Sequence, residues 1–325
     1  YPSGAFTNIG GDVSYVGTAY TFGVKASAYQ MWAWGRGYRG SLGLNQAHDT
    51  HISSPVQIPG TNWATVSGSY QSLHAIKTDG TLWSWGMNYR GNLGINSIVK
   101  YSSPVQVPGT SWEQLSTNNF ASACTRTDNT LWVWGQSTVG ILGLSQNGTE
   151  YDSPVQLPGT NWKEINLGGK VAMATKTDGT AWSWGSNSYG EIGINDRTSY
   201  SSPKQIPGTN WKRVINGNNE SAGVKTDGTL WTWGRNNNGQ LGLNNRTNYS
   251  SPVQVPGTNW SRVNSTSYHM GAIKTDGTCW MWGTGGNGML AQNNTTSYSS
   301  PVQVPGTTWI DAMPITYATL FLKNA

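Results

Sequence analysis

The stretch TDGTLWSWGMNYRGNLG, residues 78–94, sets the pattern of the whole chain, because variants of it recur at a nearly constant spacing. Its Trp-x-Trp-Gly core starts at six positions, which are Trp32, Trp83, Trp132, Trp182, Trp231 and Trp280. A second motif, Pro-Gly-Thr-x-Trp, ends at Trp63, Trp112, Trp162, Trp211, Trp260 and Trp309. Both motifs recur about every 49 residues, so the chain consists of repeats of one structural unit.

The composition of the 325 residues excludes several classes of protein. Three Trp per repeat account for all 18 Trp, and a chain with so many large aromatic side chains is not disordered. No apolar run approaches the roughly 18 residues of a membrane-spanning helix. The 42 Gly follow no three-residue period, which excludes collagen, and only 11% of the residues are charged, which excludes a coiled coil.

One repeat reads as four short strands joined by turns. The strands are expected at residues 104–107 (PVQV), near 112–115, at 74–77 (HAIK) and at 82–85 (LWSW). Asp79-Gly80 lies between two of them and is typical of a tight hairpin turn, because Gly accepts a positive φ. Trp83 and Trp85 are two residues apart, so both point to one face of the sheet. Four strands in about 49 residues are the signature of a β-propeller blade.

The two ends of the chain indicate the number of blades. Residues 22–25 and 320–323 both match the HAIK strand, which gives seven such strands against six Trp-x-Trp strands. Residues 5–9 and 12–16 weakly resemble the two strands that precede it. We therefore predict an all-β, seven-bladed propeller whose last blade lacks its fourth strand; six blades are the alternative. The single domain spans 1–325, with a partial repeat at 1–31, six units over 32–308 and closing strands at 309–325.

The residues 78–94, followed by SSPVQVPG at 102–109, resemble the regulator of chromosome condensation repeat family. The resemblance covers nearly the whole chain. It implies a seven-bladed propeller, usually closed by pairing of the two chain ends, and implies little about function. Members include a nuclear nucleotide exchange factor, a secreted β-lactamase inhibitor and uncharacterised bacterial and phage proteins, and the near-identical repeats resemble the last group most. Ala291 departs from the family's Gly-x-Leu-Gly pattern, which puts the positive-φ turn there in doubt.

No catalytic or metal-binding constellation stands out. Asp79 and its counterparts Asp128, Asp178, Asp227 and Asp276 recur on separate blades, so we interpret them as turn-forming residues. His48 and His51 share an insertion of the first repeat, but no metal-ligand spacing supports a site, and no cofactor is expected. Cys124 and Cys279 occupy strand positions of small or apolar residues and are expected to be buried and inert.

The repeats differ most at two adjacent positions, six and five residues before the conserved basic residue of the HAIK strand. We call them the first and second variable positions and expect them to cluster on one rim. The candidate binding residues at these positions are Tyr20, Gln71, Phe120, Lys170, Asn219, Glu220, Tyr268, His269 and Tyr317. Aromatic and mixed polar side chains suit protein or glycan recognition. The alternative is that these surface loops vary without a binding role.

A second variable set follows Trp-Gly and comprises Arg36, Arg39, Met87, Arg90 and Arg235. These arginines form at most a modest basic patch, and solvated loop residues are the simpler interpretation. The net charge is +5, and the chain contains no dense basic stripe, so nucleic-acid binding is not favoured.

These observations favour a non-enzymatic propeller for extracellular or virion-associated recognition, or a structural part of a surface assembly or phage particle. The expected partner is a protein or glycan at a surface. The incomplete seventh blade offers a sheet edge for a homo-oligomer or fibre. The alternatives are a secreted inhibitor or effector that binds an enzyme through one rim, and an enzyme, which no sequence feature favours.

Overall fold

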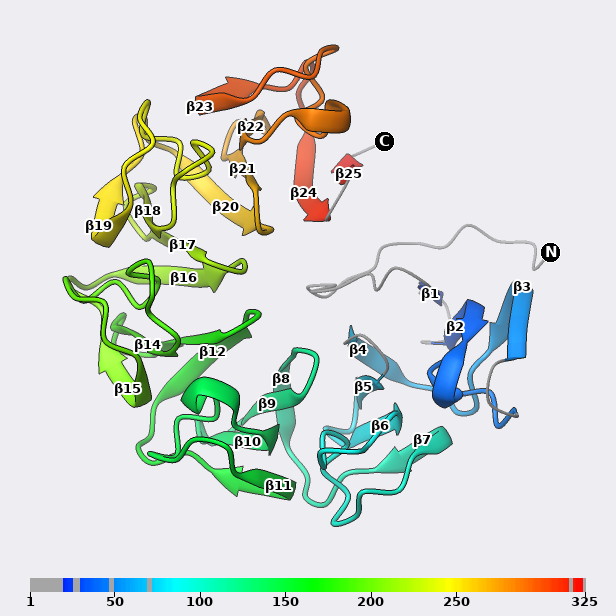
Figure 1. Cartoon of the computed structure of the whole chain (residues 1–325). Coiled ribbons are helices and arrows are strands. Elements are labelled where there is room, and N and C mark those ends of the chain that lie inside the picture. Colours follow the sequence, from blue (N-terminus) through cyan, green and yellow to red (C-terminus); the bar gives the residue numbers. More distant parts are fainter. Residues whose placement is uncertain (1–19, 26–29, 47–49, 69–71, 316–317, 324–325) are drawn as a thin grey trace. The chain divides into compact units, whose positions relative to one another are not determined.

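The computed structural model describes residues 20–25, 30–46, 50–68, 72–315 and 318–323. Contacts divide the chain into two compact units, residues 1–138 with 148–165, and residues 139–147 with 166–325. The predicted strands at 5–9 and 12–16 lie outside the described residues. Figure 1 shows the strands grouped into separate sheets, each formed from strands that are consecutive in the sequence.

The strands run in chain order as antiparallel sheets, which we number as blades. Blade 1 contains β1 (Tyr20–Lys25), β2 (Gln30–Gly37) and β3 (Thr50–Gln57), with the short 3₁₀ helix η1 (Tyr38–Gly40) after β2. Blade 2 contains β4 (Trp63–Gly68), β5 (Ser72–Lys77), β6 (Leu82–Gly86) and β7 (Tyr101–Gln106). Blade 3 contains β8 (Trp112–Thr117), β9 (Ala121–Arg126), β10 (Leu131–Gln136) and β11 (Glu150–Gln156), with η2 (Thr138–Gly140).

The later blades repeat this order. Blade 4 contains β12 (Trp162–Leu167), β13 (Val171–Lys176), β14 (Ala181–Gly185) and β15 (Tyr200–Gln205). Blade 5 contains β16 (Trp211–Asn216), β17 (Glu220–Lys225), β18 (Leu230–Gly234) and β19 (Tyr249–Gln254). Blade 6 contains β20 (Trp260–Ser265), β21 (His269–Lys274), β22 (Cys279–Gly283) and β23 (Tyr298–Gln303), with η3 (Gly286–Gly288). Blade 7 contains β24 (Trp309–Ile315) and β25 (Ala318–Lys323).

Seven sheets of this kind confirm the all-β, seven-bladed prediction, but the order of strands within a blade differs from the expected one. The proline-led PVQV segment pairs with the Trp-x-Trp strand before it, as β7 does with β6, and is the last strand of its blade. This placement suits proline, which cannot donate a ladder hydrogen bond and is tolerated at a sheet edge. As a consequence, blade 7 has two strands in the described chain, where three were expected.

Each Trp-x-Trp strand packs against the preceding blade with one face and against the following blade with the other. In blade 2, Trp85 is fully buried and packs with Trp63 against Met31 and Ile58 of blade 1. Trp63 meets Trp83 and Trp85 edge-on, at ring separations of 6.3 and 6.0 Å, so both indoles do share one face, as the alternation predicts. Leu82 lies on the other side of the same sheet and packs with the tryptophans of blade 3.

A buried hydrogen bond connects successive blades. The indole N–H of Trp134 donates to the backbone carbonyl of Asn92, the second residue of Gly-x-Leu-Gly in the preceding blade, at 3.0 Å. The same bond recurs from Trp85 to Ser41, Trp184 to Ile141, Trp233 to Glu191 and Trp282 to Gln240, at 2.7–3.0 Å. An unpaired buried indole N–H or carbonyl costs free energy, so this bond fixes how far apart the strand and the loop can lie.

The last glycine of Gly-x-Leu-Gly lies directly under the indole that makes this bond. A Cβ added to Gly193 would lie 2.6 Å from Nε1 of Trp233, and the residue has a φ of +80°. Ala291 at the corresponding position keeps the positive φ, at 56°, so the doubt about this turn is not supported. Ala291 packs with Trp309 and Phe321 of the following blade in one apolar cluster.

The opposite ends of the blades are fixed by the Thr-Asp-Gly-Thr turn. In blade 5, the indole N–H of Trp231 donates to the hydroxyl of Thr229, which donates to the carboxylate of Asp227. The backbone N–H of Thr229 donates to the same carboxylate oxygen. The ammonium group of Lys225 lies over the rings of Trp211 and Trp231, at 4.8 and 4.7 Å from their centroids. The recurring aspartates therefore form turns, as predicted.

No helix among the described residues is long and apolar enough to cross a membrane.

We expect Gly193→Ala to lower the free energy of unfolding by about 2–4 kcal/mol, because the new methyl group displaces the Trp233 indole and strains the backbone. Ala291→Gly should raise it by about 1 kcal/mol, because glycine adopts a positive φ without the strain that alanine carries there. Urea unfolding measures both changes. Gly286→Ala is the control, because its nearest contact would be 3.9 Å away. A loss for Gly193→Ala no larger than that of the control would contradict this account.

Candidate functional site

The two variable sets lie at the same end of each blade. The chain turns back before the second strand and again after the third, and in an antiparallel sheet both connections lie at one end. Backbone hydrogen bonds join them directly: the N–H of Arg235 donates to the carbonyl of Asn219 at 2.9 Å, and that of Thr284 donates to Tyr268 at 2.9 Å. We call this the loop end of a blade, and the end with the Thr-Asp-Gly-Thr turn the hairpin end.

Residues at the first variable position lie at the surface of the loop end. Phe120 is 40% exposed and Tyr268 is 42% exposed, which is high for large apolar side chains. Lys170 is exposed and Asn219 is half-buried. Gln71 and Tyr317 lie outside the described residues, and Tyr20 is the first residue of β1. Within the second unit, Lys170, Asn219 and Tyr268 directly precede β13, β17 and β21.

The residues Glu220 and His269, at the second variable position, are fully buried, which differs from the expected surface rim. The Ser265 hydroxyl of blade 6 donates to Oε1 of Glu220 at 2.9 Å. Nδ1 and Nε2 of His269 lie 3.1 and 3.2 Å from the hydroxyls of Thr266 and Thr319. Each is the first residue of the second strand of its blade, and this inner strand is buried on both faces, so the side chain lies against the next blade. The exposed position is one residue earlier, in the turn before the strand.

Burial changes the proton affinity of these interior groups. Loss of solvation raises the pKa of Glu220 to about 7, and the nearby Glu191 carboxyl acts in the same direction, although hydrogen bonds from Ser265 and from the backbone oppose the change. Desolvation likewise raises the pKa of Glu191. In the first unit, burial lowers the pKa of His74 to about 4, while its Nε2 lies 2.8 Å from the carbonyl of Asn92. Glu220 is therefore protonated in a large share of molecules near neutral pH.

The remaining candidates for chemistry are structural. The hydroxyl and the backbone N–H of Thr229 lower the pKa of Asp227 by donating to its carboxylate, so this group is a stable anion in a turn. Cys124 and Cys279 are free and buried, as predicted, and desolvation raises the pKa of Cys279 to about 12. A thiol of this kind carries almost no nucleophilic thiolate.

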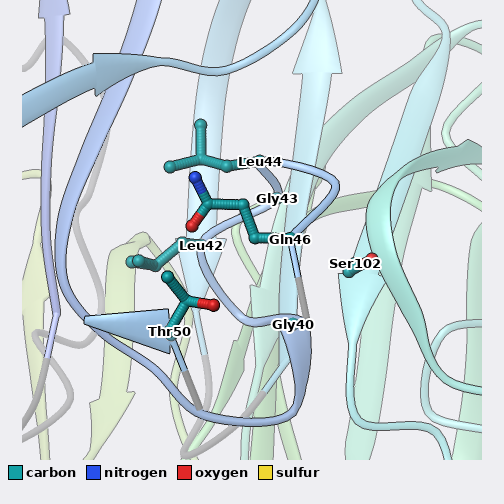
Figure 2. A pocket seen from close by; sticks show the side chains of 8 residues that line it. Gly40, Leu42, Gly43, Leu44, Gln46, Thr50 and Ser102 are labelled. Atoms are coloured by element: carbon teal, nitrogen blue, oxygen red, sulfur yellow. The ribbon is translucent and has the colours of Figure 1, made fainter. Parts of the chain in front are cut away.

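The structure gives no positive sign of a metal or small-molecule site in the part of the chain it describes. No three His, Cys, Asp or Glu side chains gather there as metal ligands. His51 lies in β3, whereas His48 is outside the described residues. A hollow of about 10 Å³ beside η1 has the room of about one water molecule. Figure 2 shows Leu42, Gln46 and Thr50 around it, with Ser102 on the neighbouring strand.

Comparisons with known proteins agree with this geometry. A family model described as RCC1-like domain matches residues 8–318. Human WBSCR16 has a similar structure, with 19% identity, a TM-score of 0.81, and coverage of 95% of this chain and 86% of WBSCR16. Prp20p from Saccharomyces cerevisiae, described with its binding to Gsp1p and histones, is 20% identical, with a TM-score of 0.78 over 92% of this chain and 78% of its own. The same yeast protein, also called RCC1, bound to Kap60 gives a TM-score of 0.78 at 18% identity, covering 95% of this chain and 80% of its own. No curated protein sequence matches the chain.

These comparisons overturn the expected location and role. The similar structures are of human and yeast proteins and point to eukaryotic intracellular proteins, so the prediction of an extracellular, virion or phage propeller is wrong. The secreted-inhibitor alternative is wrong for the same reason, and glycan, adhesion and fibre partners find no support. The expectation relied on the likeness of the near-identical repeats to uncharacterised bacterial and phage members of the family, and on the incomplete seventh blade.

The substitution Glu220→Gln tests whether burial raises the pKa of the Glu220 carboxyl. Because folding raises the pKa of Glu220, the folded protein keeps a proton that the unfolded chain releases between about pH 4.5 and 7. The free energy of unfolding of the wild type should therefore fall across this range relative to the variant, by on the order of 3 kcal/mol. Urea unfolding at several pH values measures the difference. Glu113→Gln, at an exposed position, should follow the wild type. Parallel curves for Glu220→Gln and the wild type would contradict the raised pKa.

Proposed function

Because the chain belongs to the RCC1-like domain family, as its repeats predicted, we propose that it is a non-catalytic propeller that binds a protein partner through the loop ends of its blades. Protein binding is the property that the descriptions of Prp20 name, with Gsp1p, histones and Kap60 as its partners. Those partners belong to that protein. For this chain, the support comes from its own surface.

The observation that carries the proposal is the pair of exposed aromatic side chains, Phe120 and Tyr268. Aromatic residues are enriched at the centres of protein interfaces, where they bury a large area at a low entropic cost. The turn that holds Phe120 is ordered in advance, because the Asn118 side-chain oxygen accepts hydrogen bonds from the N–H groups of Phe120 and Ala121, at 3.1 and 2.8 Å. An anchor fixed in this way loses little freedom on binding.

The non-catalytic part of the proposal follows from where the reactive groups lie. The recurring aspartates form turns at the hairpin ends, and the two cysteines are buried thiols. Glu220 has a shifted pKa, which is common in active sites, but buried structural carboxyls share this property. Its hydrogen bond to Ser265 lies inside the contact between blades 5 and 6.

The test replaces both anchors with the residue that a sister repeat carries. Phe120→Asn and Tyr268→Asn copy Asn219 onto the same backbone position, so the fold should tolerate them. The wild-type chain, immobilised and exposed to an extract of the source cells, should retain a defined protein partner, identified by mass spectrometry. Because the two anchors belong to different units, each single variant is measured beside the double variant. The double variant, and the single variant that lacks the contacting anchor, should retain at least about tenfold less.

The matched control changes the hairpin end, with Thr110→Ala and Thr258→Ala at exposed positions of the Pro-Gly-Thr turns. This variant should capture the partner as the wild type does. Equal capture by the wild type, the double variant and the control would show that the loop-end aromatics make no contact, and loss only in the control would place binding at the hairpin ends.

A further inference from the structure

The loop ends of blades 1 and 2 carry a feature that the other repeats lack. Their long loops both contain Tyr-Arg-Gly, as Tyr38-Arg39-Gly40 and Tyr89-Arg90-Gly91. The corresponding loops of blades 3 to 6 read Thr-Val-Gly, Ser-Tyr-Gly, Asn-Asn-Gly and Gly-Asn-Gly. The two Tyr-Arg-Gly loops lie side by side, since a Cβ on Gly40 would meet the backbone of Ser102 in blade 2 at 2.7 Å.

The arginine and tyrosine side chains of these loops stack on one another. The guanidinium carbon of Arg39 lies 4.8 Å from the ring centroid of Tyr38 and 4.9 Å from that of Tyr89, so it bridges the two blades. Arg36 lies over Tyr38 at 5.0 Å. Tyr89 is 51% exposed. Stacking holds the arginines in place while their charge stays at the surface.

The loop of blade 2 that carries Tyr89 also carries an exposed aliphatic pair. Ile98 and Val99 are 62% and 56% exposed, and Asn88 holds their segment in place by donating to the carbonyls of Ser97 and Val99, at 2.6 and 3.0 Å. Blade 4 has Arg197-Thr198 at this place and blade 5 has Arg246-Thr247, on the same type of turn. The turn itself therefore does not require apolar side chains, and their exposure in blade 2 has no structural use within the blade.

The described residues of the two loops carry mainly basic side chains. Residues 35–46 and 86–101 contain four basic residues and no Asp or Glu, and Asp49, which follows the first loop, lies outside the described residues. Arg90 pairs with Glu150 of blade 3 at 2.7 Å, and Nη1 of Arg39 donates to Sδ of Met87 at 2.9 Å. Arg36 is exposed beside this group.

From these contacts we infer that Arg36, Tyr38, Arg39, Tyr89, Ile98 and Val99 form a docking site, the Tyr-Arg patch, for a protein segment that combines acidic residues with an aliphatic anchor. The inference rests on the proposed protein-binding function and names the chemistry of a partner. Stacked arginines are preorganised donors for carboxylates, and Tyr89, Ile98 and Val99 provide apolar area for a Leu-, Ile- or Val-like side chain.

A nucleic acid fits this surface less well. Phosphate binding relies on many basic residues along a groove, and this patch has few. Ile98 and Val99 would face charged phosphates or sugars without a partner for their apolar area. The two ligands also respond differently to one substitution, because added positive charge strengthens phosphate binding and does not restore a lost apolar contact.

The experiment selects 12-residue peptides from a displayed random library on the full chain and measures synthetic copies of the enriched peptides by fluorescence anisotropy. All variants borrow residues from sister blades, so the backbone already accepts them. Arg36→Gln with Arg39→Val copies Gln136 and Val139, and Val139 shares the positive φ of Arg39. Ile98→Arg with Val99→Thr copies blade 4. The control, Arg235→Gln with Arg246→Thr, removes two charges from the loop of blade 5, which has no exposed aliphatic pair.

The enriched peptides should contain Asp or Glu beside an aliphatic residue and bind the wild type and the control equally. Both patch variants should bind them at least tenfold more weakly. Enrichment of peptides without acidic residues, no enrichment, or unchanged binding by either patch variant would overturn the inference. A 20-base single-stranded DNA bound more tightly by Ile98→Arg/Val99→Thr, with no loss of peptide binding, would assign the patch to nucleic acid instead.

Comparison of the Phe120 and Tyr268 variants with the patch variants distinguishes the proposed loop-end binding from binding at the Tyr-Arg patch. Peptides that lose binding with Phe120→Asn/Tyr268→Asn but keep it with both patch variants would support loop-end binding and overturn the Tyr-Arg patch. Capture of a cellular partner that is insensitive to Phe120 and Tyr268 but lost with both patch variants would support the patch and move the main contact to it.

Discussion

The hydrogen bond from a buried indole to the carbonyl of the preceding Gly-x-Leu-Gly loop is the constraint on which the rest of the structure depends. It requires a Trp at the same place in successive repeats, a loop of fixed length one repeat earlier, and a residue without a side chain under the ring. Gly193 beneath Trp233 meets the last requirement, because a Cβ there would lie only 2.6 Å from the indole nitrogen. The near-constant repeat length and the Gly-rich loops follow from this one contact, because neither can change without separating donor from acceptor.

The sequence predicted those parts of the fold that depend on contacts within one repeat. The Asp227-Gly228 turn, the shared face of Trp83 and Trp85, and the burial of Cys124 all follow from local spacing, and the structure confirms them. The boundary between blades did not follow, because the partner of the proline-led strand depends on a pairing across a long loop. For the candidate site, the variable region was located, but Glu220 and His269 turned out to be interior. A single residue separates the exposed and buried positions, and strand phase at a turn is not fixed by the local sequence.

The two kinds of loop-end surface differ in how they could recognise a partner. Phe120 and Tyr268 are separate aromatic anchors on turns beside the second strand of their blades. The Tyr-Arg patch is continuous across blades 1 and 2, because Arg39 of one blade stacks on Tyr89 of the next. The hairpin ends, by contrast, repeat the same Lys and Trp stack and Asp and Thr turn in blade after blade. The hairpin ends are therefore nearly uniform, whereas the loop ends combine the constant Gly-x-Leu-Gly contact with positions that differ between blades.

The buried polar pairs between blades have a consequence for how this chain can change. Glu220 of blade 5 needs Ser265 of blade 6, and His269 of blade 6 is matched to Thr319 of blade 7. The two pairs consist of different residues at two successive contacts between blades, although the surrounding repeats are alike. Deleting, duplicating or exchanging a blade by recombination would bury one of these groups beside the wrong neighbour, at a cost of about 1–3 kcal/mol for a buried polar group without its hydrogen bond. The blades of the second unit thus form a fixed series, and their similar sequences do not make them interchangeable.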